Sequence, residues 1–175
     1  MQRIAIPVEQ FIARPYGLWE KNWLLLTSGD YAAGKYNCMT VSWGSLGQMW
    51  GRPFAMVVVR PQRYTRQFIE AYPTFTLCAL PRQYRPALNL LGTRSGRDGD
   101  KIAESGLTPI PSTIVAAPCF AQAELVIECR KMYWQDFDPA HFLDAEIDRN
   151  YPSKDYHRMY FGEIVALSGS QAYLA

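Results

Sequence analysis

The stretch YNCMTVSWGS, residues 36–45, holds the strand from which the rest of the chain can be interpreted. Apolar residues alternate here with Thr40 and Ser42, and this period of two predicts a β-strand over residues 36–43 that ends in the indole of Trp43. The strand pattern then stops in the glycine-punctuated stretch GSLGQMWG. A large indole among small polar residues has two interpretations: core packing followed by a turn, or a surface against which a flat ligand with a polar rim lies.

Further strands and a few short helices flank this stretch. Apolar and β-branched runs predict strands over residues 22–29, 54–59, 74–80, 119–134 and 161–169. Helical patterns cover residues 63–72, residues 81–92 with an interruption near Pro86, and residues 99–105 with Ser95 or Asp98 as the cap. Strands without regular βαβ alternation predict a mainly β fold, an antiparallel barrel with helical insertions, and 175 residues suit a single domain over 1–175.

Composition excludes several classes of protein. The net charge of +2 gives no general attraction to nucleic acid, and no apolar run approaches the roughly 20 residues of a membrane span. Four cysteines without a CxxC pair, and a first segment unlike a signal peptide, predict a reducing cytoplasm. The histidines His141 and His157 are far apart in sequence, so no metal site is predicted.

Basic residues concentrate between residues 60 and 101, which favours a small anionic ligand over a polyanion. The segment GTRSGRDGDK, residues 92–101, has glycines that let backbone N–H groups point one way. Arg94, Arg97 and Lys101 add donors for phosphate oxygens. The alternative interpretation of this segment is a solvated basic turn before a capped helix.

A second candidate phosphate segment, RPQRYTR, residues 60–66, follows an apolar strand and enters a helix. Arg60, Arg63 and the hydroxyl of Thr65 could converge on a phosphate there, or the segment could be the exposed start of an amphipathic helix. The chain has no GxGxxG, Walker or GxSxG motif. His157 precedes a strand, where a lone histidine is either a strand-edge residue or a donor to a cofactor.

Four segments taken together resemble one known family in order and spacing. They are NCMTVSW, VRPQRYT, GTRSGRDGDKIAESGLTP and DYHRMYFGEIV, spread over most of residues 23–167. The family they resemble is the flavin reductase-like family. The resemblance implies an FMN-binding split antiparallel β-barrel of Greek-key type, a homodimer with FMN near the subunit interface, and NAD(P)H as electron donor. No second nucleotide motif is visible, which favours FMN over FAD.

The resemblance also implies the residues of the site. The flavin ring would be lined by Asn37, Met39, Thr40, Ser42 and Trp43. The phosphate would be held by Arg60, Arg63, Tyr64, Thr65, Ser95, Gly96, Arg97 and Lys101. His157 would be the catalytic residue that faces the ring or the nicotinamide, and Trp50 would cover the site.

Three functions are compatible with these residues. The first is a flavin reductase that transfers hydride from NAD(P)H to flavin. The second is a flavoredoxin-like carrier, which keeps FMN and exchanges electrons with a protein partner, and the third is a flavin-binding module without turnover. No acid–base constellation is visible in the sequence, and none is needed where cofactors carry the chemistry.

Overall fold

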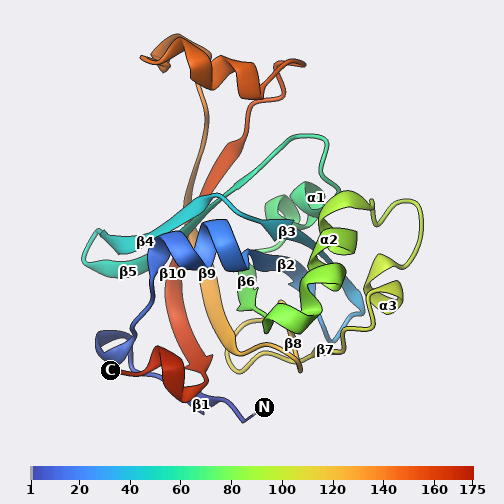
Figure 1. The fold of residues 1–175 in the computed structure, drawn as a ribbon, viewed down its shortest axis with the longest axis vertical. Helices are drawn as coiled ribbons and strands as arrows, with labels where there is room; N and C mark the ends of the chain where they lie inside the picture. The colour runs from blue at the N-terminus through green and yellow to red at the C-terminus, as the bar shows by residue number, and fades with distance from the viewer. Residues whose placement is uncertain (1) are drawn as a thin grey trace.

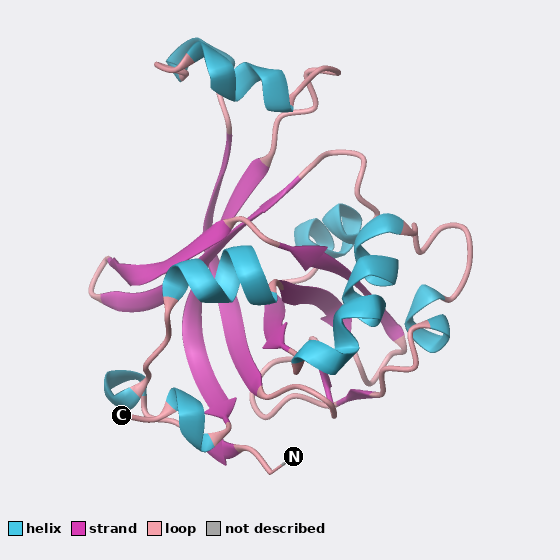
Figure 2. Ribbon diagram, in the orientation of Figure 1, coloured by secondary structure: helices cyan, strands magenta, loops and turns pink. Residues whose placement is uncertain are grey.

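Residues 2–175 are described by the structure, a computed structural model, and they are built around one antiparallel sheet (Figures 1 and 2). The strand order is β3-β2-β6-β9-β10-β5-β4, and β1 pairs with β10. The bounds are β1 (Ile4–Ala5), β2 (Leu24–Asp30), β3 (Lys35–Val41), β4 (Gly44–Met49), β5 (Arg52–Val59), β6 (Thr74–Ala79), β9 (Leu125–Asp136) and β10 (Arg158–Gly169). A separate short pair joins β7 (Pro109–Ile110) and β8 (Cys119–Phe120). The prediction of a mainly β, antiparallel fold is confirmed.

Short helices cover the sheet and fill the connections. They are the π-helix η2 (Gly17–Asn22), the α-helices α1 (Thr65–Ala71), α2 (Arg85–Thr93) and α3 (Lys101–Glu104), and the 3-10 turns η1 (Val8–Gln10), η3 (Arg82–Tyr84), η4 (Pro139–His141), η5 (Ala145–Asn150) and η6 (Gln171–Tyr173). Residues 137–157, which carry η4 and η5, form an extension that stands away from the sheet (Figure 1, top). Within residues 2–175, no helix is both long and apolar enough to cross a membrane.

The strands β3 and β4 form the two edges of the sheet, although they are neighbours in the sequence. Only Ser42 and Trp43 separate the last residue of β3 from the first residue of β4. A link of this length spans on the order of 10 Å at most, because each residue reaches about 3.6 Å. The sheet must therefore curl until its two edges meet at this corner. The result is a split barrel whose seam lies between these edges.

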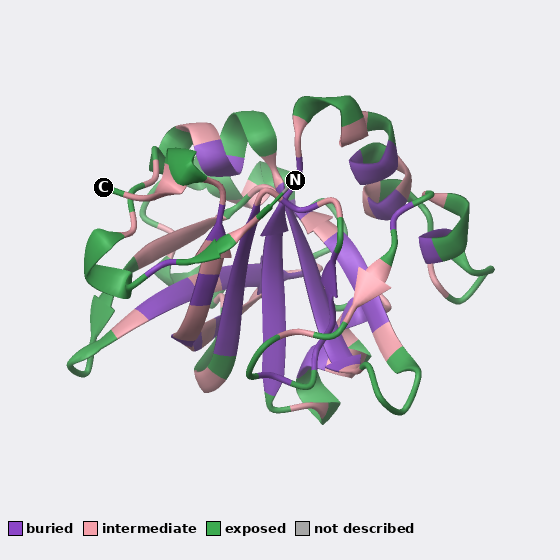
Figure 3. Cartoon of the chain, turned by 90° about the horizontal axis from the view of Figure 1, so that it is seen from below, coloured by how far each residue is buried: buried purple, intermediate pink, exposed green. Residues whose placement is uncertain are grey.

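The central strands are buried on both faces of the sheet (Figure 3). On β2, Leu24 and Leu26 enter the cluster inside the barrel, whereas Leu25 enters the outer cluster with Leu88 and Leu91 of α2. Fully burying a leucine side chain stabilises a fold by about 1.5–3 kcal/mol. Burial on both faces explains why β2 begins with three consecutive leucines rather than with an alternating pattern.

The glycine-punctuated stretch after Trp43 is itself a strand, β4, which corrects the prediction that the strand pattern stops there. A Cβ on Gly44 would lie 2.4 Å from the carbonyl oxygen of Met56 and 2.4 Å from the ring of Trp19. Glycine at this position therefore permits close packing within a strand. The turn comes later, at Gly51, where φ is +70°.

Other predicted boundaries also differ from the structure. The strand predicted over residues 119–134 is divided into β8 and β9, and η2, which was not predicted, precedes β2. Pro86 does not interrupt a helix, because it lies in the first turn of α2, where the missing N–H needs no partner. The cap of α3 is Asp100, whose side chain accepts from the Ala103 N–H, and not Ser95 or Asp98.

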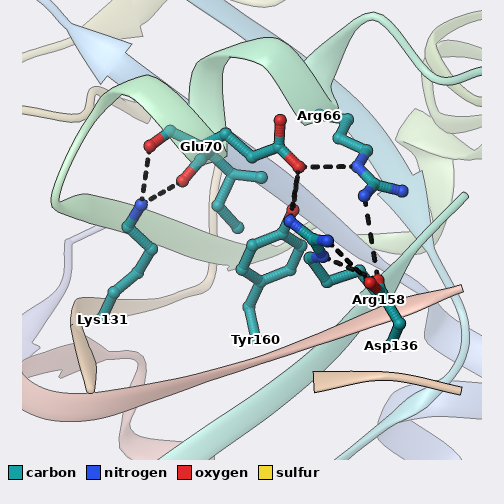
Figure 4. Close-up of polar contacts among 7 residues, drawn as sticks. Arg66, Glu70, Lys131, Asp136, Arg158 and Tyr160 are labelled. Atoms are coloured by element: carbon teal, nitrogen blue, oxygen red, sulfur yellow. Dashed lines mark hydrogen bonds and ion pairs between the residues drawn. The ribbon is translucent and has the colours of Figure 1, made fainter. Parts of the chain in front are cut away.

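Ion pairs join α1 to the hairpin of β9 and β10 (Figure 4). Glu70 Oε1 accepts from Arg66 Nε at 2.7 Å, from Arg158 Nη1 at 3.0 Å and from the Tyr160 hydroxyl at 3.2 Å. Arg158 also forms a bidentate pair with Asp136, with both distances 2.7 Å. A network of this kind fixes geometry better than an isolated surface pair. It sets the orientation of α1, which borders the candidate site.

Candidate functional site

The corner of the seam carries a cavity of about 220 Å³. It is lined by Met39, Thr40 and Val41 of β3, by the link residues Ser42 and Trp43, by Val58 and Arg60 at the end of β5, and by His157. Trp43 is 45% exposed, and its ring centroid lies 5.2 Å from that of His157. Because β3 is an edge strand, alternate backbone N–H and C=O groups along it point away from β2. The cavity therefore combines aromatic faces with a backbone edge that can donate and accept hydrogen bonds.

His157 is the last residue of the extension formed by residues 137–157. Its Nδ1 is 2.9 Å from the hydroxyl of Tyr151, and both side chains are buried. Burial, together with the positive charge of Arg60, lowers the pKa of the His157 imidazole to about 4. The ring is therefore neutral near pH 7, where it can take part in hydrogen bonds but does not supply a proton as an imidazolium.

Arg60 is tied to the same extension. Its Nη1 donates to Asp155 Oδ2 at 2.7 Å, and its Nη2 donates to the carbonyl oxygen of Asn150 at 2.8 Å. Hydrogen bonds from Arg60 and then from Gln62 lower the pKa of the Asp155 carboxyl. The guanidinium of Arg60 thus borders the cavity beside Trp43 and His157.

The opposite end of the candidate site is closed by its own hydrogen bonds. Asn37 Nδ2 donates to Thr65 Oγ1 at 2.8 Å, and these two side chains are buried. A Cβ on Gly96 would lie 2.5 Å from Asn37 Oδ1 and 3.1 Å from the ring of Tyr64. The loop that contains Gly96 therefore packs directly on β3 and on the start of α1. Only glycine fits there without displacing a neighbour.

Two cations occupy the space between this loop and α2. Lys101 Nζ donates to the carbonyl oxygens of Leu91 and Arg94 at 3.0 and 3.1 Å, and burial lowers the pKa of its ammonium. Arg63 Nη2 donates to the carbonyl oxygen of Gly92 at 2.6 Å. These bonds satisfy carbonyl groups at the end of α2, which carry partial negative charge. Since an ammonium has three N–H donors, Lys101 keeps one for a ligand.

The remaining predicted residues differ in how free their side chains are. The hydroxyl of Thr40 donates to the carbonyl oxygen of Leu88 at 2.6 Å, so this hydroxyl is bound to α2, although Thr40 also lines the cavity at the seam corner. Ser95 Oγ accepts from the Arg97 N–H at 3.2 Å. The guanidinium of Arg97 lies 4.7 Å from the ring centroid of Tyr64 and is exposed.

The structure thus distributes the predicted residues over two neighbouring cavities. The cavity at the seam corner has Met39, Thr40, Ser42, Trp43, Arg60 and His157 in its wall, and a larger cavity of about 700 Å³ has Asn37, Tyr64, Gly96 and Lys101. Arg63, Thr65, Ser95 and Arg97 belong to the segments around them. Trp50 is not with them: its ring packs on Tyr133 and Phe161.

The sequence analysis did not identify the residues that fix His157 and Arg60 in the cavity at the seam corner. Tyr151 and Asp155 orient His157 and Arg60, and Gln62 supports Asp155. Their only signal in the sequence is the cluster of aromatic and charged residues just before His157. Among residues 2–175, there is no group of three or more His, Cys, Asp or Glu side chains that could hold a metal ion.

The chemical groups of these residues are complementary to those of a flavin mononucleotide. A flat ring with a polar rim suits the backbone edge of β3 beside Trp43, and a terminal phosphate suits the Lys101 and Arg63 side chains. The close approach of Gly96 to Asn37 is the kind of backbone cradle that phosphate sites use. The chain therefore offers complementary groups for both ends of such a molecule.

Comparisons with known proteins agree with this chemistry. A family model described as the flavin reductase like domain matches residues 20–173, whereas a search of curated proteins finds no match. The fold is similar to that of an FMN-binding domain of a flavin reductases-like enzyme from Shewanella baltica OS155, with a TM-score of 0.71 and 15% identity, covering 99% of this chain and 83% of that one.

Two further solved structures share the fold. Flavoredoxin of Desulfovibrio vulgaris (Miyazaki F) has a TM-score of 0.66 and 22% identity, covering 91% of this chain and 73% of that one. An NADH:FAD oxidoreductase of Streptomyces globisporus C-1027 has a TM-score of 0.65 and 17% identity, covering 87% and 76%. At these identities the likeness establishes the fold and not the reaction.

Proposed function

Because the chain belongs to the family of flavin reductase-like domains, we propose that it binds FMN and transfers hydride from NAD(P)H to this flavin. The observation that carries the proposal is the seam corner. There an edge strand, an exposed indole and a neutral imidazole meet, and a buried lysine and a half-buried arginine lie at the opposite end of the site. The chain offers a surface for the ring and separate donors for the phosphate, as an FMN site requires.

Each part of the site has its own task in this proposal. The backbone of β3 binds the polar rim of the ring, and Trp43 covers one apolar face. Lys101 and Arg63 hold the phosphate, and the Asn37–Thr65 pair keeps β3 and α1 in register. A bound flavin supplies the hydride-accepting chemistry itself. The task of the chain is then to orient two planar molecules and to exclude water between them.

His157 positions a ligand in this scheme and is not an acid. A residue that donates a proton as an imidazolium near pH 7 needs a pKa near neutrality, whereas that of His157 is about 4. The Tyr151 hydroxyl fixes the ring, so the other ring nitrogen remains available for a hydrogen bond to flavin or nicotinamide.

A homodimer is also part of the proposal. Both edges of the sheet end at the corner that carries Trp43, and edge strands of this kind are usually covered. A second copy seated on the seam would cover the flavin ring from the solvent side. Light scattering at micromolar concentration measures this directly, and a monomer that holds flavin fully would contradict it.

The direct test of the function is anaerobic mixing of the FMN-loaded protein with NADH or NADPH in a stopped-flow spectrometer. Bleaching of the oxidised flavin absorbance within seconds is the expected result. Absence of flavin binding by calorimetry would contradict the whole proposal. Binding without bleaching by either nucleotide would contradict the reductase. Reduction by a separate protein donor would then indicate the flavoredoxin-like carrier, and no reduction by any donor would leave a flavin-binding module.

A further inference from the structure

A further cavity borders the link between β3 and β4 from the side of η2, and we call it the η2 cavity. Residues within 15–23 and 42–46 line it, and its volume of about 730 Å³ is within the range of about 300–1,000 Å³ that small-molecule sites occupy. The link residues Ser42 and Trp43 also border the seam corner, whereas His157 borders only the seam corner. The proposed flavin reaction uses no other residue of the η2 cavity.

Aromatic rings dominate the wall of the η2 cavity. Three of the five tryptophans of the chain line it together with one tyrosine, namely Tyr16, Trp19, Trp23 and Trp43. Trp19 is 6% exposed and belongs to the barrel core, so it forms the floor of the cavity. Tyr16, in contrast, is 87% exposed, and Trp43 is 45% exposed. Core packing accounts for Trp19 but leaves the two exposed rings without an explanation.

Two of these rings are held by partners that do not line the η2 cavity. The guanidinium of Arg85 lies 3.1 Å from the ring centroid of Trp23, and its Nη1 donates to the carbonyl oxygen of Lys21 at 2.6 Å. Arg85 lines a different cavity, as His157 does beside Trp43. The aromatic wall is therefore preformed, and a ligand needs little rearrangement to bind against it.

Charge distinguishes the η2 cavity from the two cavities of the flavin site. Its one charged side chain is the carboxylate of Glu20, whereas Arg60 lines the seam corner and Lys101 lines the larger cavity. Within the described part of the chain, Glu20 is exposed and forms no ion pair. A wall with a carboxylate and no cation repels the phosphate of a nucleotide and attracts a positively charged ligand.

The combination of aromatic faces with a carboxylate suits one class of ligand. The negative potential of an aromatic face attracts a cation, and tryptophan gives the strongest contact of this kind. A methylated ammonium ion has exchanged N–H groups for methyl groups, so ring faces and charge hold it rather than hydrogen bonds. Ser42 and Ser45 line the same cavity, and their hydroxyls can bind a polar group elsewhere on the ligand.

From this arrangement we infer that the η2 cavity binds a quaternary or otherwise methylated ammonium ion between its aromatic rings and Glu20. The inference goes beyond the proposed function, because it assigns a ligand to residues that the flavin reaction does not use. Trp43 is the wall that the two sites share. The ammonium ion and the flavin should therefore bind at the same time, on different sides of the link between β3 and β4.

The first test is titration of the protein with choline at constant ionic strength, followed by calorimetry and by tryptophan fluorescence. The neutral alcohol 3,3-dimethylbutan-1-ol has the same shape, with carbon in place of the charged nitrogen. Choline should bind at least about tenfold more tightly than this alcohol, because only the cation is attracted by the ring faces and the carboxylate. Choline should also bind equally well with and without saturating FMN.

The second test uses two variants of exposed side chains that the fold does not need. Glu20→Gln removes the charge and keeps the shape, and it should weaken choline by about fivefold. Tyr16→Leu should weaken choline by about two- to fivefold, as expected for one exposed cation–π contact. The matched controls are Glu9→Gln and Tyr133→Leu, at exposed residues that do not line the η2 cavity, and both should bind choline as wild type does.

Each other outcome overturns the inference. No choline binding at millimolar concentration, or equal affinity for the neutral alcohol, would reject an ammonium site. Equal losses in Glu20→Gln and Glu9→Gln would indicate general attraction to the surface instead of a site. Displacement of choline by FMN would place the probe in the seam corner and reject a separate cavity site. The proposed function is tested separately, because a protein that binds choline as described and binds no flavin would contradict that function and support this site.

Discussion

The two ends of the candidate site are built in opposite ways. Around Lys101, side chains are buried and bonded to one another and to the backbone of α2. Around Trp43, the indole is nearly half exposed, and the supporting contacts come from the extension of residues 137–157. The side chains at the Lys101 end thus contribute to the stability of the fold, whereas the exposed indole at the Trp43 end contributes little to it.

This difference teaches which end should set affinity and which should adapt. A preformed group of donors loses little entropy when a phosphate arrives, so the Lys101 end can provide a strong, fixed anchor. An open aromatic wall can accept a ring and also its reaction partner. Substitutions at the Lys101 end should therefore affect stability and binding together, whereas substitutions at Trp43 should affect binding alone.

The largest effect is expected for Lys101→Met. This variant keeps the apolar stem but leaves the carbonyl oxygens of Leu91 and Arg94 without their donor. Hydrogen bonds to charged groups contribute about 1.5–3 kcal/mol each, so the free energy of unfolding should fall by about 3 kcal/mol in urea denaturation without flavin. Arg97→Ala is the control, since the exposed Arg97 should change stability by less than about 0.5 kcal/mol. Similar small changes for both variants would show that the end is not built into the fold.

A smaller loss is expected for Gly96→Ala. The added methyl group would lie 2.5 Å from Asn37 Oδ1, and relieving this overlap should cost about 2 kcal/mol of unfolding free energy. FMN affinity should fall with it. Gly17→Ala is the matched control, because its nearest contact would be an ordinary 3.7 Å. A Gly96→Ala protein with unchanged stability and normal FMN affinity would mean that the loop can shift away from Asn37 at little cost in free energy.

The next effect is a pH dependence at the open end. The pKa of His157 is about 4 in the folded protein and about 6.5 in an unfolded chain, so the unfolded state binds more protons as the pH falls. This stabilising contribution is complete above pH 6.5 and is lost towards pH 4. Between pH 6.5 and 5.5, wild type should lose about 1 kcal/mol more unfolding free energy than His157→Gln does. His141→Gln, at an exposed histidine, should follow wild type, and parallel curves for all three proteins would contradict the shifted pKa.

The smallest change in stability is expected for Trp43→Ala. Because the indole is 45% exposed, the free energy of unfolding should change by about 0.5 kcal/mol or less. Loss of a ring contact worth about 0.5–1.5 kcal/mol should weaken FMN by roughly three- to tenfold. Calorimetry and denaturation on the same preparation measure both quantities. A large loss of stability would place Trp43 in the core rather than on an adaptable wall.

The sequence predicts those parts of the fold in which apolar and polar residues follow a regular local period. Residues 36–43 alternate clearly, and β3 lies there as Lys35–Val41. β4 was missed because its glycines read as a turn, whereas the reason for Gly44 is the ring of Trp19, a residue from a distant helix. Long-range packing of this kind leaves no periodic signal in the strand itself.

The candidate site was predictable in its residue types more than in its geometry. Charge and glycine content singled out Lys101, but nothing local indicates that its ammonium is buried against the end of α2. Tyr151 was missed because its contact with His157 forms within the irregular extension, and Asp155 was missed because Arg60 meets it only where the extension contacts the end of β5.

The two-residue link between β3 and β4 has a consequence for the order in which the chain folds. Each of these strands pairs with a neighbour in the sequence, β2 or β5, and those hairpins can form early because their loops are short. His157, in contrast, reaches the corner only when β10 has paired with β5, a contact between segments distant in the sequence. A ligand seated on that corner would bind only after this distant contact has formed. We therefore expect bound flavin to slow unfolding strongly and to leave the refolding rate almost unchanged.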